Sequence, residues 1–370
     1  MITLILPQNN ARISLLTEVQ KEFLIRNERG DHTNIEAYEW LDKNYAVGFS
    51  KANIGKVNEL NLTHPASVEF KWRSDMPSHI SVSRSRDFVS LDDRFPGNPG
   101  VCDFIAENEA NNVYTVKVIN LFADTTYYWK VVSNDLSEES EIRSFKTEKG
   151  YPRAIAVHGT TNVRDLGGLP TYNGKHIRQG CIYRGSALEN IVDPPDNFIL
   201  SERGKHTMYD VLKIKNEIDI RMNAKGLVDH SAISEDVNFN LITSRGYELF
   251  FEDHMAENRK ILTEFFADES NYPIYFHCAI GADRTGTLAM FLLMLLGVPR
   301  YYIDLDYNIT SLTVSEKRCG ITDGFYNMFL RDYSGNEPER EVMKNIDEFL
   351  ISHSGVSKET LEKLRNNLLE

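Results

Sequence analysis

The stretch Pro273-Ile-Tyr-Phe-His-Cys-Ala-Ile-Gly-Ala-Asp-Arg-Thr-Gly-Thr287 decides the fold of the C-terminal part of the chain. It begins with a short apolar run that ends at His277, continues through a turn that contains Gly281, and leads into the apolar segment 285–296. This order predicts a buried strand, a tight loop and a helix that stops at Gly297. We therefore expect the loop to follow the end of a strand and to open a helix.

The chemistry of this loop is that of an anion-binding site with a nucleophile in it. The start of a helix presents unpaired backbone N–H groups and the positive end of the helix dipole, so it binds phosphate readily. The same field lowers the pKa of a thiol and favours a thiolate at Cys278. Gly281 lets the loop turn its amides inward. Arg284, six residues after the cysteine, can hold two oxygens of a tetrahedral anion in its planar fork.

The loop resembles the HCxxGxxRTG motif of the protein tyrosine phosphatase superfamily, and more closely that of its bacterial atypical tyrosine and phosphoinositide phosphatases. Four further segments carry the same resemblance in family order: Asn162–Gly168 to the NxRDLGG signature, Ile177–Leu188 to the RPGxLYRS stretch, Ile218–Arg221 to the IDLR strand end, and 296–307 to the helices after the loop. The resemblance implies a cysteine-dependent phosphatase domain over residues 150–370, of α/β class, with a mainly parallel central sheet flanked by helices.

The resemblance also implies a role for each loop residue. Cys278 attacks phosphorus and forms a phosphocysteine, while Arg284 and the loop amides hold the phosphoryl oxygens. His277 orients the loop and supports the thiolate, and Thr285 hydrogen-bonds near the sulfur. The remaining substrate-binding positions are Ala279, Ile280, Gly281 and Ala282. Neither a metal nor another cofactor is implied, because this chemistry consists of positioning and charge stabilisation.

A carboxylic acid must protonate the leaving oxygen and later activate water. Asp283 is the leading candidate, because the subgroup carries this acid inside the loop. Asp219, at the expected strand end, is the second candidate, and its alternative role is a structural ion pair with Arg221. We expect Arg164 and Asp165 to form a structural pair with each other near the site.

Position 282 bears on the substrate. The subgroup often carries a lysine where this chain has Ala282, and that lysine would add positive charge for phosphoinositide headgroups. Its loss favours phosphotyrosine or a small phosphomonoester as the substrate. Phosphoinositide or inositol phosphate hydrolysis is one alternative, and a catalytically dead fold that binds partners through the N-terminal part is another. A sulfurtransferase or arsenate reductase is a third, which Thr285 and the segment 162–168 disfavour.

Residues 61–149 contain short alternating segments separated by turns, a pattern typical of a β-sandwich. The expected strands are 67–72, 79–83, 113–118, 127–132 and 142–147. This region resembles a fibronectin type III domain at the strand ending in Trp72 and at the segment Leu121–Trp129. The sandwich could bind a partner. Residues 1–60 are unassigned, with short helices expected at 15–24 and 36–41.

The formal net charge of −13 argues against a general binder of nucleic acid or of anionic membranes, so a phosphorylated substrate would need a local positive site. The longest apolar run, 288–298, is shorter than the ~20 residues of a membrane span. The four cysteines show no metal-ligand spacing, and Cys181, Cys102 and Cys319 are expected to be inert. The start of the chain lacks the features of a secretory signal. Localisation stays open, with a periplasmic or secreted location slightly favoured over a cytoplasmic one.

Overall fold

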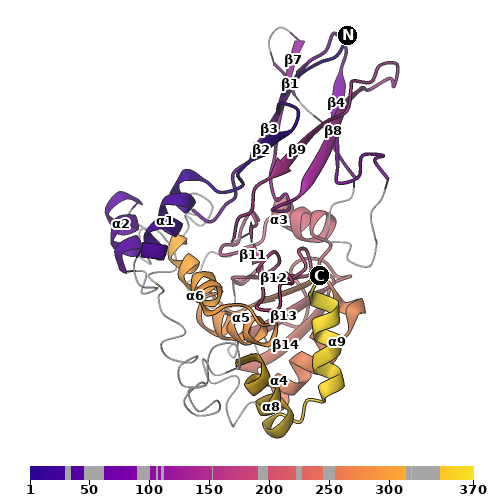
Figure 1. Cartoon of the computed structure of the whole chain (residues 1–370). Coiled ribbons are helices and arrows are strands. Elements are labelled where there is room, and N and C mark those ends of the chain that lie inside the picture. Colours follow the sequence, from indigo (N-terminus) through magenta and orange to yellow (C-terminus); the bar gives the residue numbers. More distant parts are fainter. Residues whose placement is uncertain are drawn as a thin grey trace.

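The structure is a computed structural model. It describes residues 1–29, 35–45, 62–89, 101–105, 107–109, 112–151, 153–190, 199–221, 227–244, 255–313, 318 and 342–370. Within these residues the strands form three sheets, two in the N-terminal part and one in the C-terminal part. The N-terminal strands extend away from the mixed α/β part that contains the C-terminus (Figure 1).

The two N-terminal sheets share one hydrophobic core. The first has the order β1 (Thr3–Leu6), β3 (Val68–Arg73), β7 (Val113–Val118), β6 (Glu107–Glu109). The second has the order β2 (Ala11–Ile13), β9 (Arg143–Thr147), β8 (Thr126–Ser133), β4 (Ser78–Ser83), β5 (Val101–Ile105). Alternate residues of both sheets are buried in a single cluster, in which Phe70 packs edge-on against Trp129 and Phe145.

All five strands expected between residues 67 and 147 are confirmed. The short strands β1 and β2 were not expected, and they pair with β3 and β9. Their four and three residues are too few to show a period. The two expected helices are present as α1 (Glu18–Arg29) and α2 (Ile35–Tyr45).

The third sheet has the order β10 (Arg153–Ala154), β11 (Arg164–Asp165), β12 (Ile182–Gly185), β15 (Ile274–His277), β13 (Asn216–Arg221), β14 (Asn238–Ser244). The four strands from β12 to β14 are parallel, and β10 and β11 are antiparallel to their neighbours. The expected mainly parallel α/β sheet is therefore present. β15, whose end carries the loop, lies between two parallel neighbours.

Helices cover both faces of this sheet. One face packs against a cluster that includes α5 (Asp283–Leu295), α4 (Met255–Lys260) with the helical turn Ile261–Phe266, α8 (Val342–His353) and α9 (Lys358–Leu368). The other face packs against Met208 of the helical turn Thr207–Val211, which follows α3 (Glu202–His206). The apolar positions of residues 247–267 also predict a helix there, and its first residues lie outside the described ranges. No helix in the described ranges is both long and apolar enough to cross a membrane.

The two parts of the molecule pack against each other at the helix α6 (Arg300–Asn308) and the turn Ile309–Leu312. Phe23 of α1 and Leu41 of α2 are buried in one cluster with Leu305 of α6, and α2, α1 and α6 lie side by side in Figure 1. The N-terminal helices thus pack on the C-terminal part of the chain.

Candidate active site

The loop between β15 and α5 is made of residues 278–282, as the sequence predicts. Cys278 directly follows the end of β15 and is 2% exposed. Arg284 is the second residue of α5 and is half-buried. The strand thus leads a buried thiol to the N-terminus of a helix, where an anion is stabilised.

Side chains and backbone from other segments hold the carbonyl groups of this loop. The N–H of Ala187 donates to the carbonyl of Ala279 at 2.9 Å. Asn162 Nδ2 donates to the carbonyls of residues 280 and 281 at 3.3 and 3.0 Å. Arg184 Nη2 donates to the carbonyl of Gly281 at 2.7 Å. Three successive carbonyls are therefore fixed by partners outside the loop.

This arrangement leaves the loop amides available. The N–H of each trans peptide points away from the carbonyl that shares its plane, so a clamped carbonyl directs the next amide to the opposite side. Among the described residues, no acceptor is recorded for the N–H groups of residues 279–282. Gly281 has a φ of +68°, and a Cβ there would lie 2.3 Å from the carbonyl oxygen of Gly185. The turn therefore requires glycine.

A buried charge cluster includes Arg184, one of the residues that hold the loop carbonyls. Asp306 of α6 accepts hydrogen bonds from Arg164 Nε at 2.8 Å, from the Tyr151 hydroxyl at 2.6 Å and from Arg184 Nη1. Burial raises the pKa of Asp306, but Arg164 and Arg184 outweigh it and lower the pKa to about 2. Burial, with Arg164 nearby, lowers the pKa of Arg184 to about 10. Two guanidinium groups share one carboxylate, which leaves net positive charge beside the loop.

The expected pairing of Arg164 with Asp165 is wrong. Successive residues of β11 point to opposite faces of the sheet, so the two side chains have different partners. Asp165 binds Arg153 Nη1 at 2.5 Å, and Arg164 binds Asp306. Their position near the site is confirmed for Arg164, because its Nη1 also bonds Asn162 Oδ1 at 2.5 Å.

Asp219 forms the ion pair with Arg221 that the sequence offered as its alternative role. Its two oxygens accept from Arg221 Nε at 3.0 and 2.9 Å and from Nη2 at 2.7 Å. The Arg221 N–H adds a further bond to Oδ1 at 2.8 Å. Each oxygen of this carboxylate therefore accepts two hydrogen bonds from Arg221. Both side chains are buried.

Asp283 is the first residue of α5 and is partly exposed. Its Oδ1 accepts from the Tyr307 hydroxyl at 3.0 Å and from Arg318 Nε at 2.9 Å. Thr285, the third residue of the same helix, is fully buried, and its hydroxyl has no hydrogen-bond partner among the described residues.

His277 is fully buried next to the thiol. Its Nδ1 lies 3.1 Å from the carbonyl oxygen of Cys278, and its Nε2 lies 2.8 Å from Glu217 Oε1. Sequence reasoning missed Glu217. The signal for it was present, because the polar residues 217, 219 and 221 alternate with isoleucines in a strand that is otherwise expected to be buried.

Residues 155–370 match the model of the tyrosine phosphatase family. The chain belongs to this family. A curated relative is the Cupriavidus necator protein named "Putative tyrosine-protein phosphatase H16_A0669", which is 25% identical over 180 residues, covering 41% of this chain and 61% of the relative. The chain therefore spans less than two thirds of the length of that relative.

Two solved structures are similar to this member of the tyrosine phosphatase family. The core of the PP-IP phosphatase SIW14 from S. cerevisiae is 17% identical, with a TM-score of 0.28, over 45% of this chain and 94% of that chain. TpbA from P. aeruginosa is 15% identical, with a TM-score of 0.23, over 52% and 88%.

Among the other cysteines of this family member, the structure describes the side chain of Cys181, which is buried. Burial raises the pKa of the Cys181 thiol well above its usual value, which fits the inert role expected for it. The side chain of Cys102 and the whole of Cys319 lie outside the described residues.

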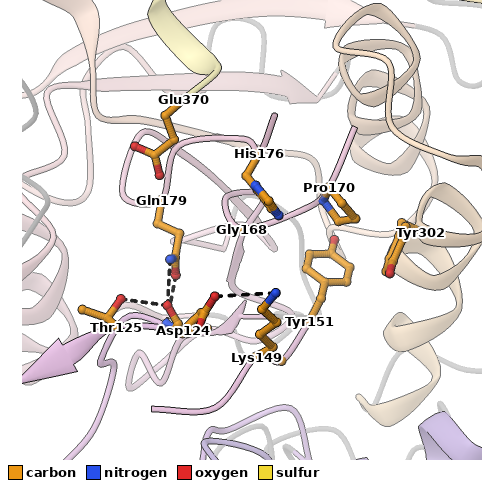
Figure 2. A pocket seen from close by; sticks show the side chains of 12 residues that line it. Asp124, Thr125, Lys149, Tyr151, Gly168, Pro170, His176, Gln179, Tyr302 and Glu370 are labelled. Carbon is orange, nitrogen blue, oxygen red and sulfur yellow. Dashed lines mark hydrogen bonds and ion pairs between the residues drawn. The ribbon is translucent and has the colours of Figure 1, made fainter. Parts of the chain in front are cut away.

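A cavity elsewhere in the molecule lies between its two parts (Figure 2). It is lined by Asp124 and Lys149 of the N-terminal part and by His176 and Tyr302 of the C-terminal part, and no residue of the loop 278–282 lines it. It is therefore distinct from the candidate active site.

Proposed function

We propose that this chain is a phosphomonoester hydrolase that works through a phosphocysteine intermediate on Cys278. The observation that carries the proposal is the clamp on the carbonyls of residues 279–281. It leaves successive amides for the oxygens of a tetrahedral phosphate above the thiol. Arg284, at the start of α5, is proposed to add a bidentate contact to the same oxygens.

The proposed reaction has two steps. The thiolate of Cys278 attacks phosphorus, the bond from phosphorus to the leaving oxygen breaks, and Asp283 gives that oxygen its proton. In the second step Asp283 takes a proton from water, the water oxygen attacks phosphorus, and the bond from phosphorus to sulfur breaks. The hydroxyl of Thr285, which has no hydrogen-bond partner within the part of the chain that the structure describes, can donate to the sulfur as its negative charge returns. His277, below the thiol, supports the thiolate in both steps.

We propose Asp283 rather than Asp219 as the acid. A proton donor needs access to the leaving group, and Asp283 is partly exposed at the start of α5, whereas Asp219 is buried and binds Arg221 through both oxygens. The contacts of Asp283 with Tyr307 and Arg318 would orient it.

The substrate proposed is phosphotyrosine or a small phosphomonoester. Ala282 is buried and adds no charge to the loop, so recognition of several phosphates would need cations from elsewhere. Hydrolysis of phosphoinositides or inositol phosphates is the alternative. A panel of phosphotyrosine peptides, phosphoinositides and inositol phosphates separates these substrates by their kcat/KM values.

We further propose that residues 61–149, joined by β1 and β2 from the start of the chain, form a β-sandwich of the fibronectin type III kind. The single core shared by the two N-terminal sheets supports this, as does the Tyr127 hydroxyl, which accepts a hydrogen bond from the N–H of Phe122 at 2.8 Å and so closes a corner. We propose that this part binds a partner, and in the alternative of a catalytically dead phosphatase fold that binding is the function of the protein.

Hydrolysis of p-nitrophenyl phosphate by the wild type and by Cys278→Ser tests the enzyme proposal. We expect turnover by the wild type and a background rate for the variant. Equal background rates for both proteins would reject the enzyme and favour the binding protein. Thiosulfate and arsenate assays test the sulfurtransferase and reductase alternatives.

A further inference from the structure

Glu217 lies inside the central sheet, where burial of a carboxylate is costly unless it is paired. It is 1% exposed on β13, next to β15. Its Oε1 lies 2.8 Å from His277 Nε2, and its Oε2 accepts a hydrogen bond from the Ser231 hydroxyl at 2.5 Å. The partners that satisfy this carboxylate thus include the histidine beside the nucleophile.

Both ring nitrogens of His277 face atoms that accept hydrogen bonds. Nδ1 meets the carbonyl oxygen of Cys278, which has no proton to give, and Nε2 meets the carboxylate of Glu217. A neutral imidazole carries one N–H, so the ring donates to both only as an imidazolium. Burial lowers the pKa of His277, but Asp219 and Glu217 outweigh it and raise the pKa. The ring of Tyr275 stacks on the imidazole at 5.4 Å.

The other charged groups around this histidine are occupied with one another. Asp219 Oδ1 lies 4.0 Å from Nδ1 of His277, but its carboxylate binds Arg221. Glu189, which follows β12, also reaches Arg221, at 3.4 Å. Among these described groups, Glu217 alone is hydrogen-bonded to the imidazole and has no ion pair with a guanidinium.

We propose that Glu217 is a positioning residue that holds His277 as an imidazolium, whose charge stabilises the thiolate of Cys278. A nearby positive charge favours the ionised form of a thiol. The inference rests on the proposed function, in which Cys278 is the nucleophile.

The variant Glu217→Gln tests the proposal because it keeps the shape of the side chain and removes its charge. The rate at which iodoacetamide alkylates Cys278 is followed across pH by mass spectrometry of the peptide that contains it. We expect the midpoint of this profile to rise by about one to two pH units, together with the acid limb of kcat/KM. The exposed Glu235→Gln is the control and should leave the midpoint unchanged. An unchanged midpoint in Glu217→Gln would overturn the proposal.

A measurement on the wild type covers the case in which that variant does not fold. Nitrogen NMR of protein labelled in histidine should show protons on both ring nitrogens of His277 at pH 7, and a neutral ring would refute the proposal. Turnover of p-nitrophenyl phosphate is scored separately. If the wild type shows no turnover but the midpoint rises in Glu217→Gln, the phosphatase is rejected and the role of Glu217 is supported. If the wild type shows turnover but the midpoint is unchanged in Glu217→Gln, the phosphatase is supported and the role of Glu217 is rejected.

Discussion

At the scale of single residues, the arginines of the site divide into those that are paired and one that is available. Arg164 and Arg184 share the carboxylate of Asp306. Among the described residues, no ion-pair partner is recorded for Arg284. A cation whose charge is not already neutralised by a carboxylate can contribute its full attraction to a bound phosphate.

We predict that Arg284→Lys lowers kcat/KM for p-nitrophenyl phosphate by about a hundredfold or more. The charge is kept, but a lysine cannot supply the planar bidentate fork. Arg365→Lys is a matched control, since Arg365 binds both oxygens of Asp347 away from the loop. That control should keep its turnover, and near-normal turnover of Arg284→Lys would contradict the assignment.

The two carboxylates proposed for proton transfer predict different defects. Asp283→Asn should slow phenyl phosphate far more than p-nitrophenyl phosphate, by about 10²-fold or more for the poor leaving group, because only that leaving group needs a proton. The ratio of the two kcat values measures this dependence.

Asp219→Asn should instead lower the free energy of unfolding by about 3 kcal/mol, because the buried guanidinium of Arg221 loses the carboxylate that neutralises its charge. Urea denaturation measures that loss. If the dependence on the leaving group appears in Asp219→Asn instead, the acid is Asp219.

At the scale of the element, the loop after β15 is shaped by segments that precede it in sequence. Ala187 follows β12, Arg184 lies within β12, and Asn162 precedes β11. Each fixes one or two loop carbonyls, and none of them belongs to the strand or helix that the loop joins. The loop therefore needs the neighbouring strands in place before its amides are directed inward.

We predict that Gly281→Ala is more damaging than its size suggests. A positive φ costs an alanine about 1 kcal/mol, and the new Cβ would collide with the carbonyl of Gly185. The loop must shift, so affinity for vanadate, a phosphate mimic, should fall at least tenfold in an inhibition assay.

Gly174→Ala separates the cost of the positive φ from the cost of the collision. Gly174 also has a positive φ of +80°, but no atom lies within 4 Å of the added Cβ. This control should lose a little stability and keep its vanadate affinity. Equal vanadate affinity in Gly281→Ala would show that the loop tolerates the displacement.

At the scale of the whole molecule, the junction between the two parts reaches the buried charge cluster around Asp306. Tyr151 precedes the region that matches the family, yet its hydroxyl donates to Asp306. Gln179 exchanges two hydrogen bonds with the backbone of Ala123, and Arg153 donates to the carbonyl of Leu121 at 3.2 Å. The N-terminal part is thus hydrogen-bonded to the part that carries the loop.

The low pKa of Asp306 predicts how stability depends on pH. Its pKa of about 2 in the fold lies below the ordinary 3.8, so the carboxylate contributes stability above pH ~4 that is lost as the pH falls towards 2. The contribution is about 2 kcal/mol. Tyr151→Phe removes one donor, so it should cost about 1–2 kcal/mol at pH 7 and make the loss in acid smaller. Urea denaturation at pH 7, 4 and 2.5 measures both effects.

Tyr209→Phe is the control for this prediction. The hydroxyl of Tyr209 also donates to a carboxylate, that of Asp236 at 2.8 Å, but the pair is exposed. Its loss should change stability by less than about 0.5 kcal/mol. Equal costs for the two variants would show that the junction does not depend on Tyr151.

The sequence by itself determined the local order of strand, loop and helix around Cys278, because apolar runs, glycines and helix stops act over a few neighbouring residues. It also predicted five strands between residues 67 and 147 and the parallel sheet, but not β5 and β6, which lie in the same range. It did not reveal β1 and β2, which are too short to show a period and exist through pairing with distant strands.

Only the tertiary structure decided which groups surround the loop. Asn162 lies 119 residues before Gly281, whose carbonyl it holds, and Glu217 lies 60 residues before His277. Arg164 pairs with Asp306 rather than with its sequence neighbour. The physical reason is that a buried polar group bonds to whatever partner the packed sheet brings within about 3 Å, and that partner depends on how distant strands align rather than on spacing along the chain.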